Sequence, residues 1–387
     1  MKKFACFAIR RACTDERVHR RDQSGSRGKL GRGREFYANE FSATHTLSLM
    51  KVSAPTPSSG SATVIPIGTG RPWLARLTPG LFAIVFGLLG LAGAWRRLPG
   101  DSAPYSGIIA NALLFAGTGL LLLLLVLMCL KDVRYRAEAA KDRAHPVTAA
   151  LTSLMSITVL LSVALWLPIY PSHSELASSV TVAALIAHGV IAWRVVSRVA
   201  TGDLPADMVT PALYLPPVGG GLIGALAVSA LGWHGWSVLL FGIGVGAWAL
   251  LELRVMNRLF VGPLPPPLRP TVGVEIASAP VTTLVAATLW PALPADVLLI
   301  GLGISCGPLI AVLARWRWWT SVPFSAGFWS FSFPIAAFAA VVVEVVRRGS
   351  WPIAVAYAAV LAATAVIAYL AVRTLALLYR GRLLPPG

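Results

Sequence analysis

The chain has 387 residues, of which 56% are hydrophobic and 13% are charged, and its mean hydropathy is +0.71. Soluble domains usually carry about a quarter of their residues as charged side chains, so this composition excludes a soluble globular class. The net charge of +17 would suggest nucleic-acid binding in a soluble protein. Here the arginines lie in the N-terminal tail and between apolar runs, as membrane topology requires, so no nucleic-acid partner is expected.

The N-terminal region, residues 1–74, is basic, rich in Ser, Gly and Thr, and lacks a long apolar run. This composition predicts a disordered tail. Met50 is an alternative start, in which case residues 1–49 would be absent from the mature protein. The membrane domain is predicted over residues 75–384, followed by a short tail at 385–387.

Ten apolar runs follow the tail, and the fourth, which carries His188, is the shortest. A helix of about 20 residues at 1.5 Å per residue spans a hydrocarbon core of roughly 30 Å. The predicted fold class is therefore an all-α polytopic membrane protein with ten transmembrane helices. The predicted spans are 77–95, 107–130, 147–167, 178–193, 212–231, 237–253, 272–289, 297–313, 325–346 and 352–377.

The loop charges predict how these spans are oriented. Most basic loop residues follow even-numbered spans, and the loop after the second span holds Lys131, Arg134, Arg136, Lys141 and Arg143. The opposite loops hold two pairs, Arg96 with Arg97 and Arg347 with Arg348. Because cytoplasmic loops carry the excess of Lys and Arg, both termini are predicted to lie in the cytoplasm, with the protein in the inner (plasma) membrane.

Proline is concentrated in the odd-numbered spans, which hold Pro79, Pro216, Pro280 and Pro334. Each proline frees a backbone carbonyl, and in a membrane that carbonyl needs a partner from a neighbouring helix or from water. Pro308 is the one clear internal proline of the even-numbered spans. We therefore expect the odd helices to form an inner, kinked ring and the even helices to face lipid.

Phe333 precedes Pro334 in the ninth span and lies about eight residues, or roughly 12 Å, along it. An aromatic ring near the middle of the membrane would block ions sterically and by dewetting. Ordinary packing against neighbouring helices is the alternative. The middle of the odd spans contains no Lys or Arg, which favours conduction past backbone dipoles and hydroxyls over tight binding by a carrier.

Several polar residues within the spans are candidates for contact with an anion. The candidate hydroxyls are Ser330, Ser332, Thr282 and Thr283, although each can instead bond to a carbonyl of its own helix. Glu275 would repel anions if it were ionised, so it is either paired with an arginine or takes part in proton coupling, with His188 as a second proton carrier. Glu344, near a helix end, is expected to reach the membrane interface.

Enzyme functions find little support in this sequence. It has no His-rich cluster, no phosphate-binding loop, and no serine, histidine and acid that the topology brings together. The four cysteines make no metal-type cluster. No catalytic residue, metal site or cofactor is therefore predicted.

Six segments carry a resemblance to a known family. They occur in consistent order over about residues 75–384, and the combination of ALYLP with FWSFSF is the most specific feature. The segments are TPGLFAIVFGLLGLAGAW (78–95), RAHPVTAALTSL (143–154), TPALYLPPVGGGLIGALAVSALGW (210–233), LRPTVGVEIASAPV (268–281), PFSAGFWSFSFPIAA (323–337) and RTLALLYRGRLL (373–384). They resemble the bacterial tellurite-resistance/dicarboxylate transporter family, which includes the TehA proteins and the plant slow anion channels.

The resemblance implies ten helices arranged as five hairpins around a central pore, with odd helices inside and even helices outside. It implies a homotrimer with one pore per subunit, and a phenylalanine gate on the ninth helix that matches Phe333. The substrates implied are small anions, chloride and nitrate for channels, with dicarboxylate, sulfite or tellurite for a proton-coupled transporter or exporter. Channel and coupled carrier both remain open at this point.

Two departures from the family pattern concern prolines of the inner helices. Some relatives have a proline in the middle of the third helix, where this chain has Ser156. In the seventh helix the proline is displaced from position 278, a serine, to Pro280. Pore width and anion preference therefore do not follow from the resemblance.

Overall fold

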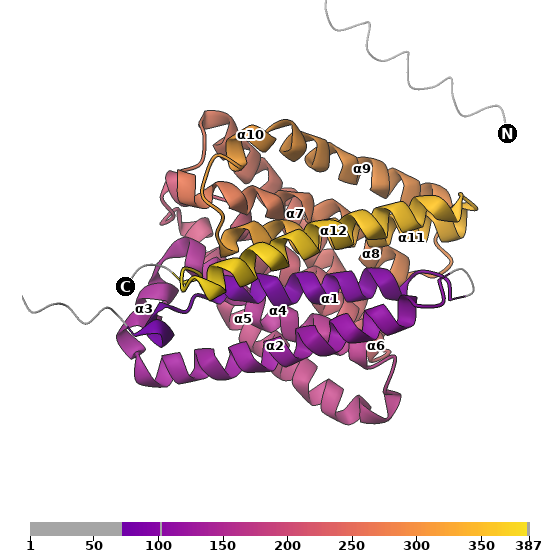
Figure 1. Cartoon of the computed structure of the whole chain (residues 1–387), viewed down its shortest axis with the longest axis horizontal. Helices are drawn as coiled ribbons and strands as arrows, with labels where there is room; N and C mark the ends of the chain where they lie inside the picture. The colour runs from indigo at the N-terminus through magenta and orange to yellow at the C-terminus, as the bar shows by residue number, and fades with distance from the viewer. Residues whose placement is uncertain (1–71, 101–102, 385–387) are drawn as a thin grey trace, which may run out of the picture. The chain divides into compact units, whose positions relative to one another are not determined.

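The computed structural model describes residues 72–100 and 103–384. The predictions for the N-terminal tail, including the alternative start at Met50, fall outside this part of the chain. The described residues form helices and no strand, and ten helical segments are long and apolar enough to cross a membrane, which confirms the predicted class (Figure 1). The ten spans are Pro79–Arg96, Ser106–Arg134, Pro146–Trp166, Pro171–Thr201, Pro211–Ala230, His234–Val261, Pro266–Leu289, Ala295–Ala314, Ala326–Gly349 and Ile353–Tyr379.

The odd-numbered and even-numbered spans differ sharply in burial. Between 56% and 83% of the residues in the most apolar window of each odd span are buried, against 11% to 28% in the even spans. An apolar helix that is mostly exposed within a single chain needs lipid or another protein surface around it. The odd spans are therefore inner helices and the even spans are outer helices.

Five inner α-helices pack against one another in a closed ring. Each contacts the next, and the last returns to the first. These helices are α1 (Phe82–Arg96), α4 (Pro146–Trp166), α6 (Gly220–Ala230), α8 (Ser278–Leu289) and α11 (Ser332–Gly349).

Each outer helix packs against the inner helix that precedes it in the chain and against one further inner helix. The outer helices are α2 (Ser106–Arg134), α5 (Ser174–Thr201), α7 (His234–Val261), α9 (Ala295–Ala314) and α12 (Ile353–Tyr379). Two helices, α3 (Arg136–Ala144) and α10 (Trp316–Trp319), and the 3₁₀ turn Ala206–Met208 lie between spans. The 3₁₀ turn Trp73–Arg76 precedes the first span, and Pro171–His173 begins the fourth.

Four of the five inner spans do not begin as α-helix. They begin with 3₁₀ turns or, in the fifth span, with a 3₁₀ turn and a π-helical turn. Proline occurs in three of these irregular starts, where its missing N–H and fixed φ are tolerated. The segments are Pro79–Leu81, Pro211–Tyr214 with Leu215–Gly219, Pro266–Ile276 and Ala326–Phe331. The third span, which lacks the mid-helix proline, is one continuous α-helix from Pro146.

The fourth span differs in length from the prediction of 178–193. The helix α5 runs over 28 residues, because polar residues extend it beyond the apolar core at both ends. Hydropathy detects the part of a helix inside the hydrocarbon and misses ends that extend into the polar interface.

Candidate anion pore

A small cavity of about 60 Å³ lies between the N-terminal halves of the five inner spans. Every inner span contributes to its wall, for example through Phe86, Leu154 and Val274. The wall is almost wholly apolar and includes three hydroxyl residues, Tyr214, Ser278 and Ser330. Tyr214 donates to Glu252 over 2.7 Å, and Ser330 donates to the carbonyl of Pro270. Cavities with such apolar walls stay dry.

A second, larger cavity of about 470 Å³, here called the vestibule, lies between the C-terminal halves of the same five spans. In every inner span the residues that line the vestibule follow those that line the small cavity, or overlap them by a residue or two. The five inner spans therefore run in the same direction along one axis. Both cavities lie on this axis.

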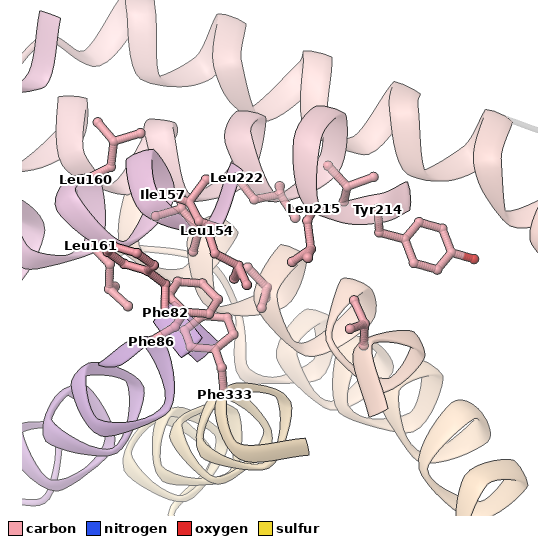
Figure 2. Close-up of a cluster of buried hydrophobic side chains, with 14 of the residues drawn as sticks. Phe82, Phe86, Leu154, Ile157, Leu160, Leu161, Tyr214, Leu215, Leu222 and Phe333 are labelled. Atoms are coloured by element: carbon pink, nitrogen blue, oxygen red, sulfur yellow. The ribbon is translucent and has the colours of Figure 1, made fainter. Parts of the chain in front are cut away.

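Phe333 lines both cavities and stands at the boundary between them. Its ring stacks on Phe86 with centroids 3.7 Å apart and an interplanar angle of 24°. Figure 2 shows the two rings meeting between α1 and α11, beside Leu154 and Ile157 of α4. Phe333 is 7% exposed, so its ring is buried where the two cavities meet, together with Val281, which also lines both.

Two glycines of α1 allow α11 to approach closely enough for this contact. A Cβ atom on Gly90 would lie 2.7 Å from Cδ2 of Phe333, and one on Gly87 would overlap the Ser332 side chain. Close helix approach through small residues is a common way to pack helices within membranes. The position of the Phe333 ring therefore depends on the absence of side chains from α1.

The four prolines predicted to kink or line the inner spans are all buried, but they differ in whether they line a cavity. Pro334 lines the small cavity in the first turn of α11, where a missing N–H costs no helix bond. Pro280 has the same position in α8, and Pro79 begins its 3₁₀ turn. These three residues and Pro216 are buried, but of the four prolines only Pro334 is among the residues that line either cavity.

Pro216 lies in the π-helical turn, and its carbonyl bonds to an outer helix. In a regular α-helix this carbonyl would accept from the N–H of Gly220, which here donates to Pro217. The Nε2–H of His188, on α5, donates to the Pro216 carbonyl over 2.6 Å, and Nδ1 lies 2.8 Å from the Ser156 hydroxyl. His188 therefore ties this irregular turn of an inner span to an outer helix.

The hydroxyls of the ninth span bond to backbone carbonyls. Ser332 donates to Trp329 over 2.6 Å and lies 3.4 Å from the Ala83 carbonyl, and it lines neither cavity. Ser330 lines the small cavity although its hydroxyl is already occupied. Thr283 donates within its own helix to Ala279 over 2.9 Å, whereas the Thr282 hydroxyl is buried without a partner in the described part of the chain.

Glu275 lies in the irregular start of the seventh span and is 5% exposed. Its Oε2 is 3.4 Å from Nη2 of Arg315, at the end of α9. A buried carboxylate inside a membrane is expected to have such a partner, because an unpaired charge there is costly. The pairing that the sequence raised as one of two alternatives is therefore present in the structure.

The vestibule contains a charged cluster that the sequence reasoning missed. Glu344 is 7% exposed, and its carboxylate lies 3.5, 3.2 and 3.4 Å from Arg97, Arg347 and Arg348. Burial lowers the pKa of the Arg97 guanidinium and the Glu344 carboxylate raises it, and arginine stays charged in proteins. The sequence did hold a signal for this cluster. Arginines occur in pairs at 96–97 and 347–348, in two loops that are predicted to lie on the same side of the membrane.

Comparison with known proteins agrees with this architecture. Residues 76–375 match the SLAC1 family, described as voltage-dependent anion channel. The chain is also similar to a tellurite resistance protein TehA homolog from Haemophilus influenzae, with 26% identity over 270 residues, covering 68% of this chain and 79% of the relative. Since the match runs through all five inner and all five outer spans, the chain belongs to the SLAC1 family of membrane anion channels and transporters.

Proposed function

We propose that the protein is an integral membrane channel that passes small anions, such as chloride, nitrate or related oxyanions, along the axis inside the five inner spans. Phe333 is the gate in this proposal. The observation that carries it is that the ring of Phe333 borders both of two cavities that the same five spans line. A dry, apolar constriction of this kind stops ions until the ring moves.

A channel is favoured over a tightly binding carrier by the chemistry of the small cavity. No Lys or Arg is among the residues that line it, so an anion there would be stabilised by backbone dipoles and leave readily. Conduction requires binding that is weak enough for the ion to depart. A tightly binding carrier would be expected to hold its substrate with a cation at mid-membrane.

The experiment that tests this function is current measurement on the purified protein in planar bilayers. Reversal potentials with chloride, nitrate, sulfite and malate exchanged across the membrane would report which anions permeate. We expect anion-selective unitary current steps. Saturable counterflow without unitary steps would instead identify a carrier, and the absence of anion flux of either kind would refute the proposal.

Replacing the gate residue tests its role separately from the function. We expect Phe333→Ala to raise anion current by about ten-fold or more, because it joins the two cavities. Phe338→Ala is the matched control, since Phe338 lies on the same helix but lines neither cavity. Unchanged current in Phe333→Ala at normal surface expression would remove Phe333 as the gate.

A proton-coupled carrier or exporter of dicarboxylate, sulfite or tellurite is the second candidate. The similarity to the Haemophilus tellurite resistance protein TehA homolog and the buried carboxylate of Glu275 support it. The ion pair of Glu275 with Arg315 favours a structural role for this carboxylate. Uptake driven by an imposed pH gradient, and lost in Glu275→Gln, would establish the carrier.

We further propose that the protein is a homotrimer in the inner (plasma) membrane, with both termini in the cytoplasm. The loop charges support this orientation by the positive-inside rule. Native mass spectrometry of the detergent-purified protein would measure the oligomeric state. Labelling of single cysteines introduced beside Arg348 and Arg380 in spheroplasts would report the orientation.

A further inference from the structure

The vestibule brings four arginines to the mouth of the axis. Arg96 and Arg97 end the first span, and Arg347 and Arg348 lie in the last turn of α11. All four line the vestibule, and the one carboxylate in its wall is that of Glu344. Three positive charges therefore remain in excess on the described residues around this cavity.

Two of these guanidinium groups are held in place by backbone carbonyls. Arg97 Nη1 donates to the Gly93 carbonyl over 2.9 Å. Arg348 Nη2 donates to the Ala287 carbonyl over 2.8 Å and Nη1 to that of Leu293 over 3.3 Å. Arginines oriented by the protein need no rearrangement to meet an anion, which lowers the cost of binding.

The other two arginines have donors to spare. Arg347 is 48% exposed in its side chain and pairs with Glu344 through Nη1. Arg96 Nη2 donates to Asn111 over 2.7 Å, while its Nε is buried without a partner in the described part of the chain. A buried donor left without an acceptor is costly, so a movement of the Arg96 side chain that brings this N–H to an anion in the vestibule would be favoured.

We propose that this arginine cluster is an oxyanion-loading site at the mouth of the pore, with Glu344 as its built-in counter-ion. The inference rests on the proposed channel function. Guanidinium groups present parallel N–H donors that match two oxygens of one anion, so an oxyanion is favoured over a halide of equal charge. Glu344 already places a carboxylate among three of the arginines, and it weakens the site so that the anion can leave.

Binding to the purified trimer or monomer in detergent tests the site without requiring conduction. Nitrate is the probe, chloride is the comparison of equal charge, and the readout is the apparent unfolding temperature, which a ligand of the folded state raises. We expect nitrate to raise it more than chloride does. The shift should shrink in the double variant Arg96→Gln/Arg347→Gln and grow in Glu344→Gln.

Arg380→Gln is the control, because it removes the same charge from the exposed C-terminal end of the chain and should leave the nitrate shift unchanged. A shift that is equal for nitrate and chloride would overturn the preference for oxyanions. A shift that is insensitive to both vestibule variants would overturn the site itself. The opposite signs expected for the arginine and glutamate variants separate loss of binding from general loss of stability.

Conduction gives an independent readout. In the Phe333→Ala background at roughly 20 mM salt, where charges act over tens of ångströms, the double arginine variant should lower the current of one polarity about three-fold or more. Single-channel rectification should therefore change, and molar salt should abolish the difference. An equal reduction of both polarities that persists in molar salt would contradict the loading site.

The two proposals fail in different ways. If neither the wild type nor Phe333→Ala carries anion current but nitrate still shifts the unfolding temperature through the arginines, the channel function fails and the binding site stands. If current flows but neither the nitrate shift nor rectification responds to the vestibule variants, the loading site fails and the channel stands.

Discussion

The two cavities on the axis share the same five helices and differ in nearly everything else. The N-terminal cavity is about 60 Å³ and apolar, whereas the C-terminal vestibule is about 470 Å³ and carries four arginines. The boundary between them is the ring of Phe333, stacked on Phe86. The apolar constriction at Phe333 and the arginines of the vestibule therefore lie at separate positions on one axis. Substitutions should accordingly affect closure and anion capture separately.

The largest effect within the small cavity, after removal of Phe333, is expected from Phe86→Ala. Of the two cavities, Phe86 lines only the small one, and from α1 it stacks on Phe333, the proposed gate. We expect a rise in anion current of about three-fold, smaller than that of Phe333→Ala, because the ring of Phe333 loses its stacking partner but remains. Bilayer currents at equal protein density measure this.

The double variant Phe86→Ala/Phe333→Ala tests whether Phe86 acts through Phe333. Residues in contact are not additive in their effects, so the double variant should conduct little more than Phe333→Ala alone. Strictly multiplicative effects would show that Phe86 acts elsewhere than through Phe333. In either case the dependence of current on nitrate concentration should match that of the wild type, because the arginines of the vestibule are unchanged.

His188→Ala should weaken the wall of the small cavity and leave the vestibule unchanged. It leaves the carbonyl of Pro216, in the π-helical turn, without its donor, and an unsatisfied buried group costs about 2 kcal/mol. We expect a lower apparent unfolding temperature in detergent, with the nitrate-induced shift preserved. His234→Ala, at an exposed position, is the control and should match the wild type.

If His188→Ala unfolds at the wild-type temperature, the π-helical turn does not depend on α5. If it also abolishes the nitrate shift, the two cavities are coupled and the separation described above is wrong. Replacement of Gly220 by Ala should resemble His188→Ala, because a Cβ at that position would overlap the imidazole ring.

Glu275→Gln tests whether the N-terminal half of the axis moves protons. The carboxylate is buried and pairs with Arg315 at 3.4 Å, so we expect the variant to lower stability, because the Arg315 charge loses its partner, and to change anion current by less than about two-fold. Flux should be indifferent to an imposed pH gradient. Glu252→Gln, which removes a second acid bonded to Tyr214 and Trp248, is the matched control.

Hydropathy and the placement of prolines predicted most of the fold. Runs of apolar residues predicted all ten spans, and prolines in the odd spans predicted which helices are buried, because both are local properties of the chain. The ends of α5 were missed, since polar helix ends outside the hydrocarbon leave no apolar pattern.

The contacts across helices were not predictable from local patterns. Glu344 meets Arg97 from 247 positions away, and Ser332 reaches the carbonyl of Ala83, through the packing register of α1 on α11. That register depends on where Gly87 and Gly90 let the two backbones approach. The spacing of residues within either segment does not determine this register, so the vestibule cluster could be identified only from the structure.

The smallest effect is expected from Ser332→Ala. Ser332 is next to the gate ring and was a candidate for lining the pore, but its hydroxyl is fully buried and donates to the Trp329 carbonyl over 2.6 Å. Loss of this bond should cost about 1 kcal/mol or less of folding free energy. The reversal potential between chloride and nitrate should not move, because the hydroxyl faces backbone rather than the axis.

Ser330→Ala is the matched comparison, since Ser330 does line the small cavity although its hydroxyl bonds to Pro270. Both variants should leave the nitrate-to-chloride permeability ratio unchanged if anion preference arises at the arginines of the vestibule. A change of ratio in Ser330→Ala alone would place part of the selectivity in the small cavity. A change in Ser332→Ala would mean that the hydroxyl turns toward the axis when Phe333 moves, so that closure and selectivity share one site after all.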